Sequence, residues 1–191
     1  MKGLRIGFAI SGSFCTIDGV LSVIQSLADE GADITPILSF SASTTDTRFG
    51  RCADLHAKLE KITGKKPLDT LVGVEPIGPQ GLLDVLVVAP CTGSTLGRLA
   101  NGISDTPVAL AVKAQLRCCR PVVIAVSTND ALGASMRNIS LLNNAKNIYF
   151  VPFKQDNPIS KPNSMIADFS MIPETISAAI EGKQIQPLII S

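Results

Sequence analysis

The sequence predicts one α/β domain in which a doubly wound parallel sheet lies between two layers of helices. Short segments that are apolar throughout alternate along the chain with segments whose apolar residues recur every three or four positions. Strands that are apolar on both faces are typical of a parallel sheet covered on both sides. The chain has 191 residues and no internal repeat, so a single domain spanning 1–191 is expected.

The N-terminal third predicts two strands and two helices. A strand over 4–10 precedes a helix over 17–28, whose apolar residues follow helical spacing. The second strand covers 34–38, and Pro36 within it indicates an edge strand or a bulge. A helix over 45–63 should follow, and its inward residues would be Phe49, Cys52, Leu55, Leu59 and Ile62.

The middle of the chain is expected to hold a loop, a strand and two helices. The stretch 65–81 is rich in Gly and Pro and predicts a loop, after which 85–89 is a buried strand. Apolar residues at helical spacing follow it up to residue 103. Asp105 is expected to cap the next helix, with Pro107 in the first turn.

The C-terminal part completes the alternation of strands and helices. Strands are predicted over 122–126 and 148–151, and helices over 132–144 and 173–181. The stretch 154–164, KQDNPISKPNS, contains two prolines and is expected to be a mobile loop.

Charge and composition restrict the classes of partner. Seventeen basic and sixteen acidic residues give a net charge of +1, which argues against nucleic acid or an acidic membrane surface as the main partner. No stretch approaches the roughly 18 apolar residues of a membrane span. The first thirteen residues fit a strand and turn better than a signal peptide, so a cytoplasmic protein is expected. With five cysteines lacking ligand spacing and a single histidine, no metal site is expected.

Small hydroxyl residues follow four of the predicted strands. They occur at 11–13, 39–44, 92–95 and 127–129. Ligands of an open parallel sheet bind beyond the carboxyl ends of its strands, where helix N-termini favour anions. The alternative is that these residues only cap the following helices. Together they predict a site for a phosphate-bearing ligand, and its expected residues are Ser11, Gly12, Ser13, Ser39, Ser41, Thr92, Ser94, Thr95, Ser127, Thr128 and Asn129.

The loops favour a mononucleotide over NAD or ATP. Gly12 is the only glycine of the first loop, so the Gly-x-Gly-x-x-Gly pattern of dinucleotide sites is missing. No acidic residue ends the second strand, and there is no Walker A lysine. FMN held by hydroxyls and backbone amides fits this pattern best. We expect residues 11–13 and 39 at its phosphate, and residues 92–95 and 127–129 at its ribityl chain and ring.

One segment resembles a known family. PCTGSTLGRLANGISD, residues 90–105, resembles the signature PASANTIAKIANGIADN of the homo-oligomeric flavin-containing cysteine decarboxylases, a family that includes the flavin prenyltransferases. AISGSF and ILSFSAS are similar to its first two FMN loops, and VSTNDALGASMRNISLL to its Pro-x-Met-Asn segment. The resemblance covers 1–150 and implies FMN in a flavodoxin-like, Rossmann-like sandwich that assembles as trimers or dodecamers. The residues shared with the signature are Pro90, Thr95, Ala100, Asn101, Gly102, Ile103 and Asp105.

The length and the motif variants resemble one member of that family most, from spore-forming bacteria. This implies an oxidoreductase subunit in the mother-cell cytoplasm that helps a separate partner subunit to remove two hydrogens from a small dicarboxylate. NAD(P) would then bind only to the partner. Two alternatives remain: a non-catalytic scaffold or substrate-binding partner of that subunit, and a flavin-dependent decarboxylase of another substrate.

The chain departs from the family at residues used for catalysis. Cysteine decarboxylases carry a histidine before the third strand, where residues 72–76 contain none, and an asparagine where Ser94 stands. Ser127 replaces the basic residue of the prenyltransferases. Neither peptidyl-cysteine decarboxylation nor prenyl transfer is therefore expected.

Three residues are candidates for catalysis. His56 is the one side chain whose ordinary pKa lies near neutrality, and Arg48 and Arg51 could face a dicarboxylate. The alternative for all three is a solvated helix surface. The predicted helix after Thr106 carries apolar residues on more than one side, which predicts a contact between subunits.

Overall fold

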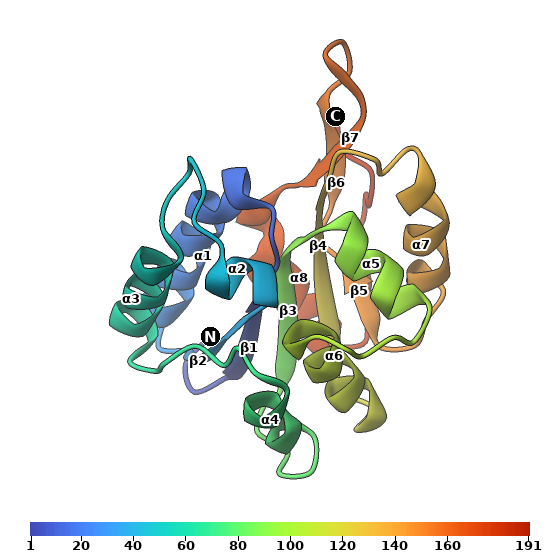
Figure 1. Ribbon diagram of the computed structural model, residues 1–191. Helices are drawn as coiled ribbons and strands as arrows, with labels where there is room; N and C mark the ends of the chain where they lie inside the picture. Colours follow the sequence, from blue (N-terminus) through green and yellow to red (C-terminus); the bar gives the residue numbers. More distant parts are fainter.

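The computed structural model describes residues 1–191, and seven strands form a single sheet in it (Figure 1). The order is β2-β1-β3-β4-β7-β6, and β5 pairs with β4 beside this path. The strands are β1 (Arg5–Ile10), β2 (Asp33–Leu38), β3 (Val85–Cys91), β4 (Val122–Thr128), β5 (Ile148–Phe150), β6 (Phe153–Asn157) and β7 (Lys161–Ala167).

The first five strands are parallel, as predicted, and β2 with its Pro36 is an edge strand. β6 and β7 are antiparallel to each other, and β7 is antiparallel to the end of β4. The expectation of a loop over 154–164 was therefore wrong, since two paired strands and a turn occupy these residues, while their mobility stays a prediction. These residues are mostly exposed and polar because the hairpin leaves the core, so they lack the apolar signal that the other strands carry.

Helices cover both faces of the sheet. α1 and α8 pack on one face, while α6 packs on the other together with α4 and α5 (Figure 1). α3 lies against α1 and the edge strand β2, and α7 packs against α5 and β5. The bounds are α1 (Ile17–Asp29), α2 (Phe40–Thr44), α3 (Cys52–Thr63), α4 (Leu71–Val74), α5 (Gly93–Ala100), α6 (Pro107–Arg117), α7 (Ala134–Asn143) and α8 (Ile172–Ile180), with 3-10 turns at Phe14–Thr16, Glu75–Ile77 and Phe169–Met171. None of these helices has the length and apolarity that crossing a bilayer requires.

Two predictions about helices were wrong. The helix expected over 45–63 begins only at Cys52, whose N–H donates to the Asp46 carboxylate at 2.8 Å. Gly50, two residues earlier, has a φ of 149°, which is not a helical conformation. Phe49, expected inside, is 51% exposed as a result. A second short helix, α4, lies within the stretch expected to be a loop.

The cap of α6 is one residue later than expected. The Thr106 hydroxyl accepts from the Ala109 N–H at 3.3 Å, while Asp105 pairs with Arg98 at 2.9 Å. The apolar residues of α6, such as Val108 and Val112, are buried within the chain. The predicted subunit contact through this helix is therefore wrong, because α4, α5 and the sheet already cover its wide apolar surface.

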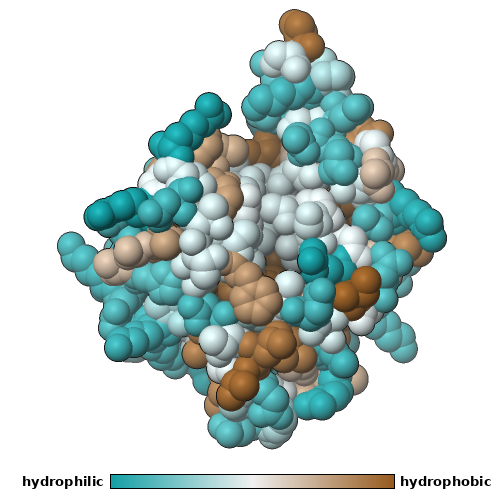
Figure 2. Space-filling model, viewed as in Figure 1, coloured by the Kyte–Doolittle hydropathy of each residue, from teal (hydrophilic) through white to brown (hydrophobic).

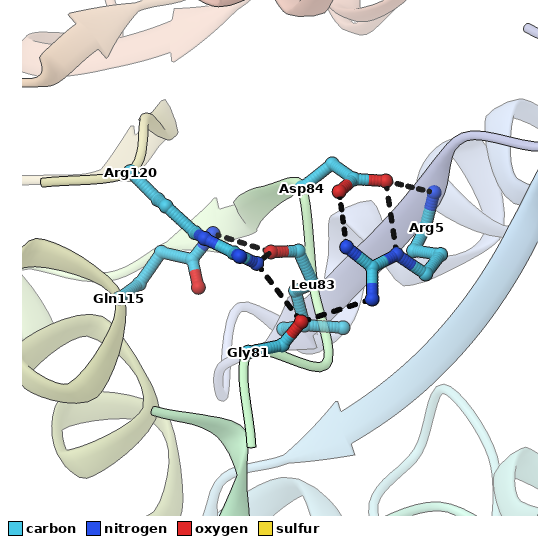
Figure 3. A network of polar contacts seen from close by, with 6 residues as sticks. All are labelled: Arg5, Gly81, Leu83, Asp84, Gln115 and Arg120. Carbon is cyan, nitrogen blue, oxygen red and sulfur yellow. Dashed lines mark hydrogen bonds and ion pairs between the residues drawn. The ribbon is translucent and has the colours of Figure 1, made fainter. Parts of the chain in front are cut away.

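A polar network fixes the amino ends of the central strands (Figure 3). Arg5 opens β1 and donates from Nε to Asp84 at 3.1 Å, just before β3. Its backbone N–H donates to the same carboxylate at 3.0 Å. Arg120, just before β4, donates to the carbonyls of Gly81 and Leu83. The network therefore sets the starting positions of three adjacent strands.

Candidate functional site

A cleft of about 910 Å³ lies beyond the carboxyl ends of β1, β3 and β4. This is where an open parallel sheet binds its ligands, and the volume suits a cofactor-sized molecule. The β6–β7 hairpin projects from the sheet (Figure 1), and its residues Asp156, Lys161 and Ser164 line one side of the cleft. The surface at the foot of the hairpin is of intermediate hydropathy (Figure 2). The lining residues are Gly12, Ser13, Phe14, Cys15, Thr16, Phe49, Thr92, Gly93, Ser94, Ser127, Thr128, Asn129, Asp130, Asp156, Lys161, Ser164, Met165 and Ile166.

Ser11 links the first loop to the third beneath the cleft. Its hydroxyl donates to the Pro90 carbonyl at 2.7 Å and accepts from the Thr92 N–H at 3.0 Å. The residue is buried and does not line the cleft. Ser11 therefore holds the loops in place without facing a ligand.

Ser13 and Ser127 join the first loop to the fourth. Their hydroxyl oxygens lie 2.8 Å apart, and the Thr16 hydroxyl lies 3.1 Å from that of Ser13 and 3.4 Å from that of Ser127. All three residues line the cleft. They form a neutral cluster of donors and acceptors at its floor.

The second loop lies beside the first. Ser39 caps α2 by accepting from the Ala42 N–H at 3.2 Å, and its hydroxyl is 3.2 Å from that of Ser41. A Cβ on Gly12 would lie 2.8 Å from the Ser41 hydroxyl, so Gly12 allows the close approach of the two loops. Neither Ser39 nor Ser41 lines the cleft.

Thr92 begins the third loop and caps α5. Its hydroxyl accepts from the Thr95 N–H at 3.4 Å and lies 3.1 Å from the Thr95 hydroxyl. Thr95 is buried, whereas Thr92 and the exposed Ser94 line the cleft.

Asp130 organises the fourth loop. Its Oδ1 accepts from the Thr128 hydroxyl at 2.5 Å and from the Ser135 hydroxyl at 2.8 Å. A Cβ on Gly93 would lie between 2.7 and 2.9 Å from the side-chain oxygens of these three residues. Glycine at 93 therefore permits α5 to begin against this cluster.

The structure brings most of the predicted binding residues together. Those that line the cleft are Gly12, Ser13, Thr92, Ser94, Ser127, Thr128 and Asn129. Ser11, Ser39, Ser41 and Thr95 lie behind or beside them and hold the loops in place. Whether these residues contact a flavin stays a prediction.

The three catalytic candidates lie outside the cleft. His56 Nε2 lies 3.1 Å from the Ser43 hydroxyl, which itself donates to Asp69 at 2.6 Å. Arg51 pairs with Asp54 at 2.9 Å. Arg48 lies over the Phe49 ring, 4.8 Å from its centre. Each of the three side chains therefore contacts a neighbour on its own part of the chain and none lines the cleft.

Sequence reasoning missed the hairpin wall and the two aromatic residues of the lining, Phe14 and Phe49. It also assigned no role to Asp130. An aspartate two residues after a Ser-Thr pair at a strand end is a recognisable cap pattern, and that signal could have found it. The hairpin residues had no comparable signal.

The donors of the cleft suit a phosphate-bearing flavin. The backbone N–H groups of Gly12, Gly93 and Ser94 have no acceptor within the chain. Amides of this kind at loops and helix starts bind phosphate, and the surrounding hydroxyls suit a polyol chain. The residues present therefore fit FMN.

Residues 1–181 match the Flavoprotein family over nearly the whole chain. The chain belongs to this family. The flavoprotein is 45% identical over 190 residues to the B subunit of dipicolinate synthase from Bacillus subtilis, a match that spans 100% of this chain and 95% of the relative.

Solved structures agree with the assignment. The B subunit of dipicolinate synthase from Bacillus halodurans superposes with a TM-score of 0.91 at 45% identity, over 100% of this chain and 97% of the other. The FMN-dependent cysteine decarboxylase TvaF is 28% identical with a TM-score of 0.58, over 73% of this chain and 85% of that one. The flavoprotein therefore has the single-domain, mostly parallel α/β fold of its family.

Proposed function

We propose that this flavoprotein is the B subunit of a dipicolinate synthase and binds FMN in the cleft. It acts with a separate A subunit to convert dihydrodipicolinate to dipicolinate, in the mother-cell cytoplasm during sporulation. The observation that carries the proposal is 45% identity along the whole chain to the B subunit of dipicolinate synthase from Bacillus subtilis. A cofactor-sized cleft at the carboxyl ends of the strands supports it.

Each part of the cleft has a role in this proposal. The amide of Gly12 and the hydroxyl of Ser13 bind the FMN phosphate, and Ser11, Ser39 and Ser41 hold their loops in position. Thr92, Ser94 and residues 127–129 contact the ribityl chain and the ring, and the buried Thr95 supports Thr92 from behind. Bound FMN supplies a two-electron acceptor or donor next to a small dicarboxylate.

The cleft offers no obvious acid-base pair for the substrate. Asp130 accepts hydrogen bonds from Thr128 and Ser135, and Asp156 pairs with Lys161 at 2.7 Å. We therefore place NAD(P) and its chemistry on the A subunit.

The lack of an acid-base pair in the cleft also favours a second candidate function. With His56, Arg48 and Arg51 outside the cleft, this chain could serve as a non-catalytic scaffold or substrate-binding partner of the A subunit. A flavin-dependent decarboxylase of another substrate is the third candidate, since a decarboxylase is among the related structures.

Reconstitution separates these candidates. Dipicolinate formation is measured with the A subunit alone and with both subunits, each with and without FMN. The proposal predicts that the full rate needs both chains and rises with flavin content. A full rate from the A subunit alone contradicts it, and a rate that needs this chain without FMN supports the scaffold. Release of carbon dioxide from a carboxylate substrate by this chain alone supports the decarboxylase.

The proposal includes a homo-oligomer, either a trimer or a dodecamer. Apolar residues gather over α2 and α4 (Figure 2), where Phe40, Leu71 and Val72 are exposed, the last by 83%. An apolar surface of this kind is typical of subunit contacts. Light scattering at micromolar concentration should give a multiple of three chains, and a mass near 20.1 kDa would reject the oligomer.

A further inference from the structure

The β6–β7 hairpin is attached to the sheet over a short length and then projects past it (Figure 1). β7 pairs with β4 through Ser127 with Ile166 and Thr128 with Met165. Ser127 and Thr128 both line the cleft, so the hairpin rises directly from its floor. Its wall residues Asp156, Lys161 and Ser164 therefore face a ligand bound below.

Lys161 is the one basic residue among the lining residues. Its Nζ lies 2.7 Å from Asp156 Oδ2, which also accepts from the Ser164 hydroxyl at 3.3 Å. An ammonium group has three N–H donors, so the ion pair leaves two for another acceptor. The ammonium is charged at neutral pH, as in any exposed lysine, and the hydrogen bond to Asp156 raises the pKa of Lys161 further.

Asp156 and Lys161 both line the cleft and lie next to a register shift between the two strands of the hairpin. Gln155 pairs with Met165 and Asn157 with Lys161, so three residues of β7, 162–164, lie opposite the single residue Asp156. A bulge of this kind changes the direction of a side chain next to a functional site. The Asn157 side chain accepts from the N–H groups of Ile159 and Ser160, which closes the tip of the hairpin. Lys161 is thus held by a paired strand.

We propose that Lys161 binds one carboxylate of the dicarboxylate substrate and makes the hairpin the substrate-selective wall of the cleft. The inference rests on the proposed function, since that function supplies the dicarboxylate. The two aspartates of the lining repel a carboxylate, and Lys161, whose side chain is 58% exposed, is the one cation of the lining that can offset this repulsion. The phosphate of FMN is instead bound by the backbone amides of the loops.

The test measures the affinities of four proteins for FMN, riboflavin and two pyridine carboxylates. Wild type, Lys161→Met, Lys161→Arg and Lys154→Met are titrated with FMN and with riboflavin by flavin fluorescence. The FMN-loaded proteins are then titrated by calorimetry with pyridine-2,6-dicarboxylate and with pyridine-2-carboxylate. Lys154 is a matched control because it lies on the same hairpin, in β6, outside the lining of the cleft.

We expect Lys161→Met to weaken the dicarboxylate by about threefold to fivefold, because an ion pair to a largely exposed ammonium group is lost. Lys161→Arg should restore most of the affinity, and Lys154→Met should behave as wild type. The dicarboxylate should lose more affinity than the monocarboxylate. FMN binding should stay unchanged in all four proteins.

Three outcomes with the variants overturn the inference. In the first, Lys161→Met binds the dicarboxylate as wild type does. In the second, Lys154→Met loses as much affinity as Lys161→Met. In the third, Lys161→Met weakens FMN but not riboflavin, which would place Lys161 at the phosphate. Loss of FMN binding in the wild type, with Lys161-dependent dicarboxylate binding retained, rejects the proposed cofactor and leaves this inference standing. A wild type that binds neither ligand rejects both.

Discussion

The hydroxyls of Ser13 and Ser127 lie 2.8 Å apart although 114 positions separate them in the chain. The contact joins the end of β1 to the end of β4, across the end of the intervening β3. Since both residues line the cleft, the hydrogen bond sets the distance between two of its walls. It also leaves each hydroxyl with capacity for a ligand.

Replacing either serine should weaken FMN binding. Ser13→Ala and Ser127→Ala are each expected to raise the dissociation constant about fivefold, the effect of one lost hydrogen bond. The double variant should lose less than the sum, because the two hydroxyls bond to each other. Ser22→Ala on the exposed side of α1 is the control. Strictly additive losses, or an equal loss in the control, would contradict the coupling.

Two glycines of α5 should respond differently to alanine. Gly93→Ala places a Cβ within 2.9 Å of three side-chain oxygens at the cleft, and Gly97→Ala meets only Asn138 Nδ2 at 3.5 Å. We expect Gly93→Ala to lower the free energy of unfolding by about 1–3 kcal/mol and to weaken FMN. Gly97→Ala should raise it by about 0.5 kcal/mol through helix propensity. Urea unfolding of both variants measures these changes. Equal changes in the free energy of unfolding would show that the close packing at Gly93 is unimportant.

Cysteine alkylation should report the occupied cleft. Cys15 is exposed and lines the cleft, whereas Cys119 is exposed after the end of α6, outside the cleft. FMN should slow the iodoacetamide reaction of Cys15 and leave that of Cys119 unchanged. Cys91 should stay unmodified in the folded protein, because burial raises the pKa of its thiol. Peptide mass spectrometry measures all three, and an unprotected Cys15 at saturating FMN would place the flavin elsewhere.

The Arg5–Asp84 pair should make the free energy of unfolding depend on pH in the acidic range. Hydrogen bonding to Arg5 lowers the pKa of Asp84 below its ordinary 3.8. The resulting stability is fully present above the unfolded-state pKa and is lost as the pH falls through the lower folded-state value. Asp84→Asn should therefore cost about 1 kcal/mol at neutral pH, a figure kept small because the pair is partly exposed, and almost nothing in strong acid. Urea unfolding of the wild type and of Asp84→Asn, measured from neutral pH to strong acid, tests this prediction.

FMN binding provides the control for Asp84→Asn. Asp84 lies at the opposite end of the six-residue strand β1 from Ser11, about 20 Å away. The variant should bind FMN as wild type does. An equal loss of stability at both ends of the pH range would show that the ion pair is not the cause.

The sequence predicts the parallel part of this fold well because its signals are local. Each of β1, β3 and β4 is a buried apolar run, and Pro36 indicates the edge. The β6–β7 hairpin was missed because its strands pair outside the core, so neither apolar alternation nor burial marks them. The width of the apolar surface on α6 was misinterpreted because sequence cannot tell whether the cover comes from the same chain.

The candidate site was predictable in part for the same reason. Hydroxyl residues at strand ends converge in any parallel sheet, and the cleft contains most of those named. Lys161 was missed because its position depends on an antiparallel pairing with a register shift. That pairing lies far along the sequence from the first three loops of the cleft. His56 was a candidate on its chemistry, and only the structure shows that it faces Ser43 instead of the cleft.

The most direct test of the account is a titration of the purified protein with FMN, followed by flavin fluorescence. We predict one FMN per chain with a dissociation constant of tens of micromolar or tighter, a binding free energy of about 6 kcal/mol or more. Ser13→Ala should shift the curve to weaker binding. A folded wild-type protein that leaves flavin fluorescence unchanged at roughly 100 µM FMN would contradict the central claim that this cleft is a flavin site.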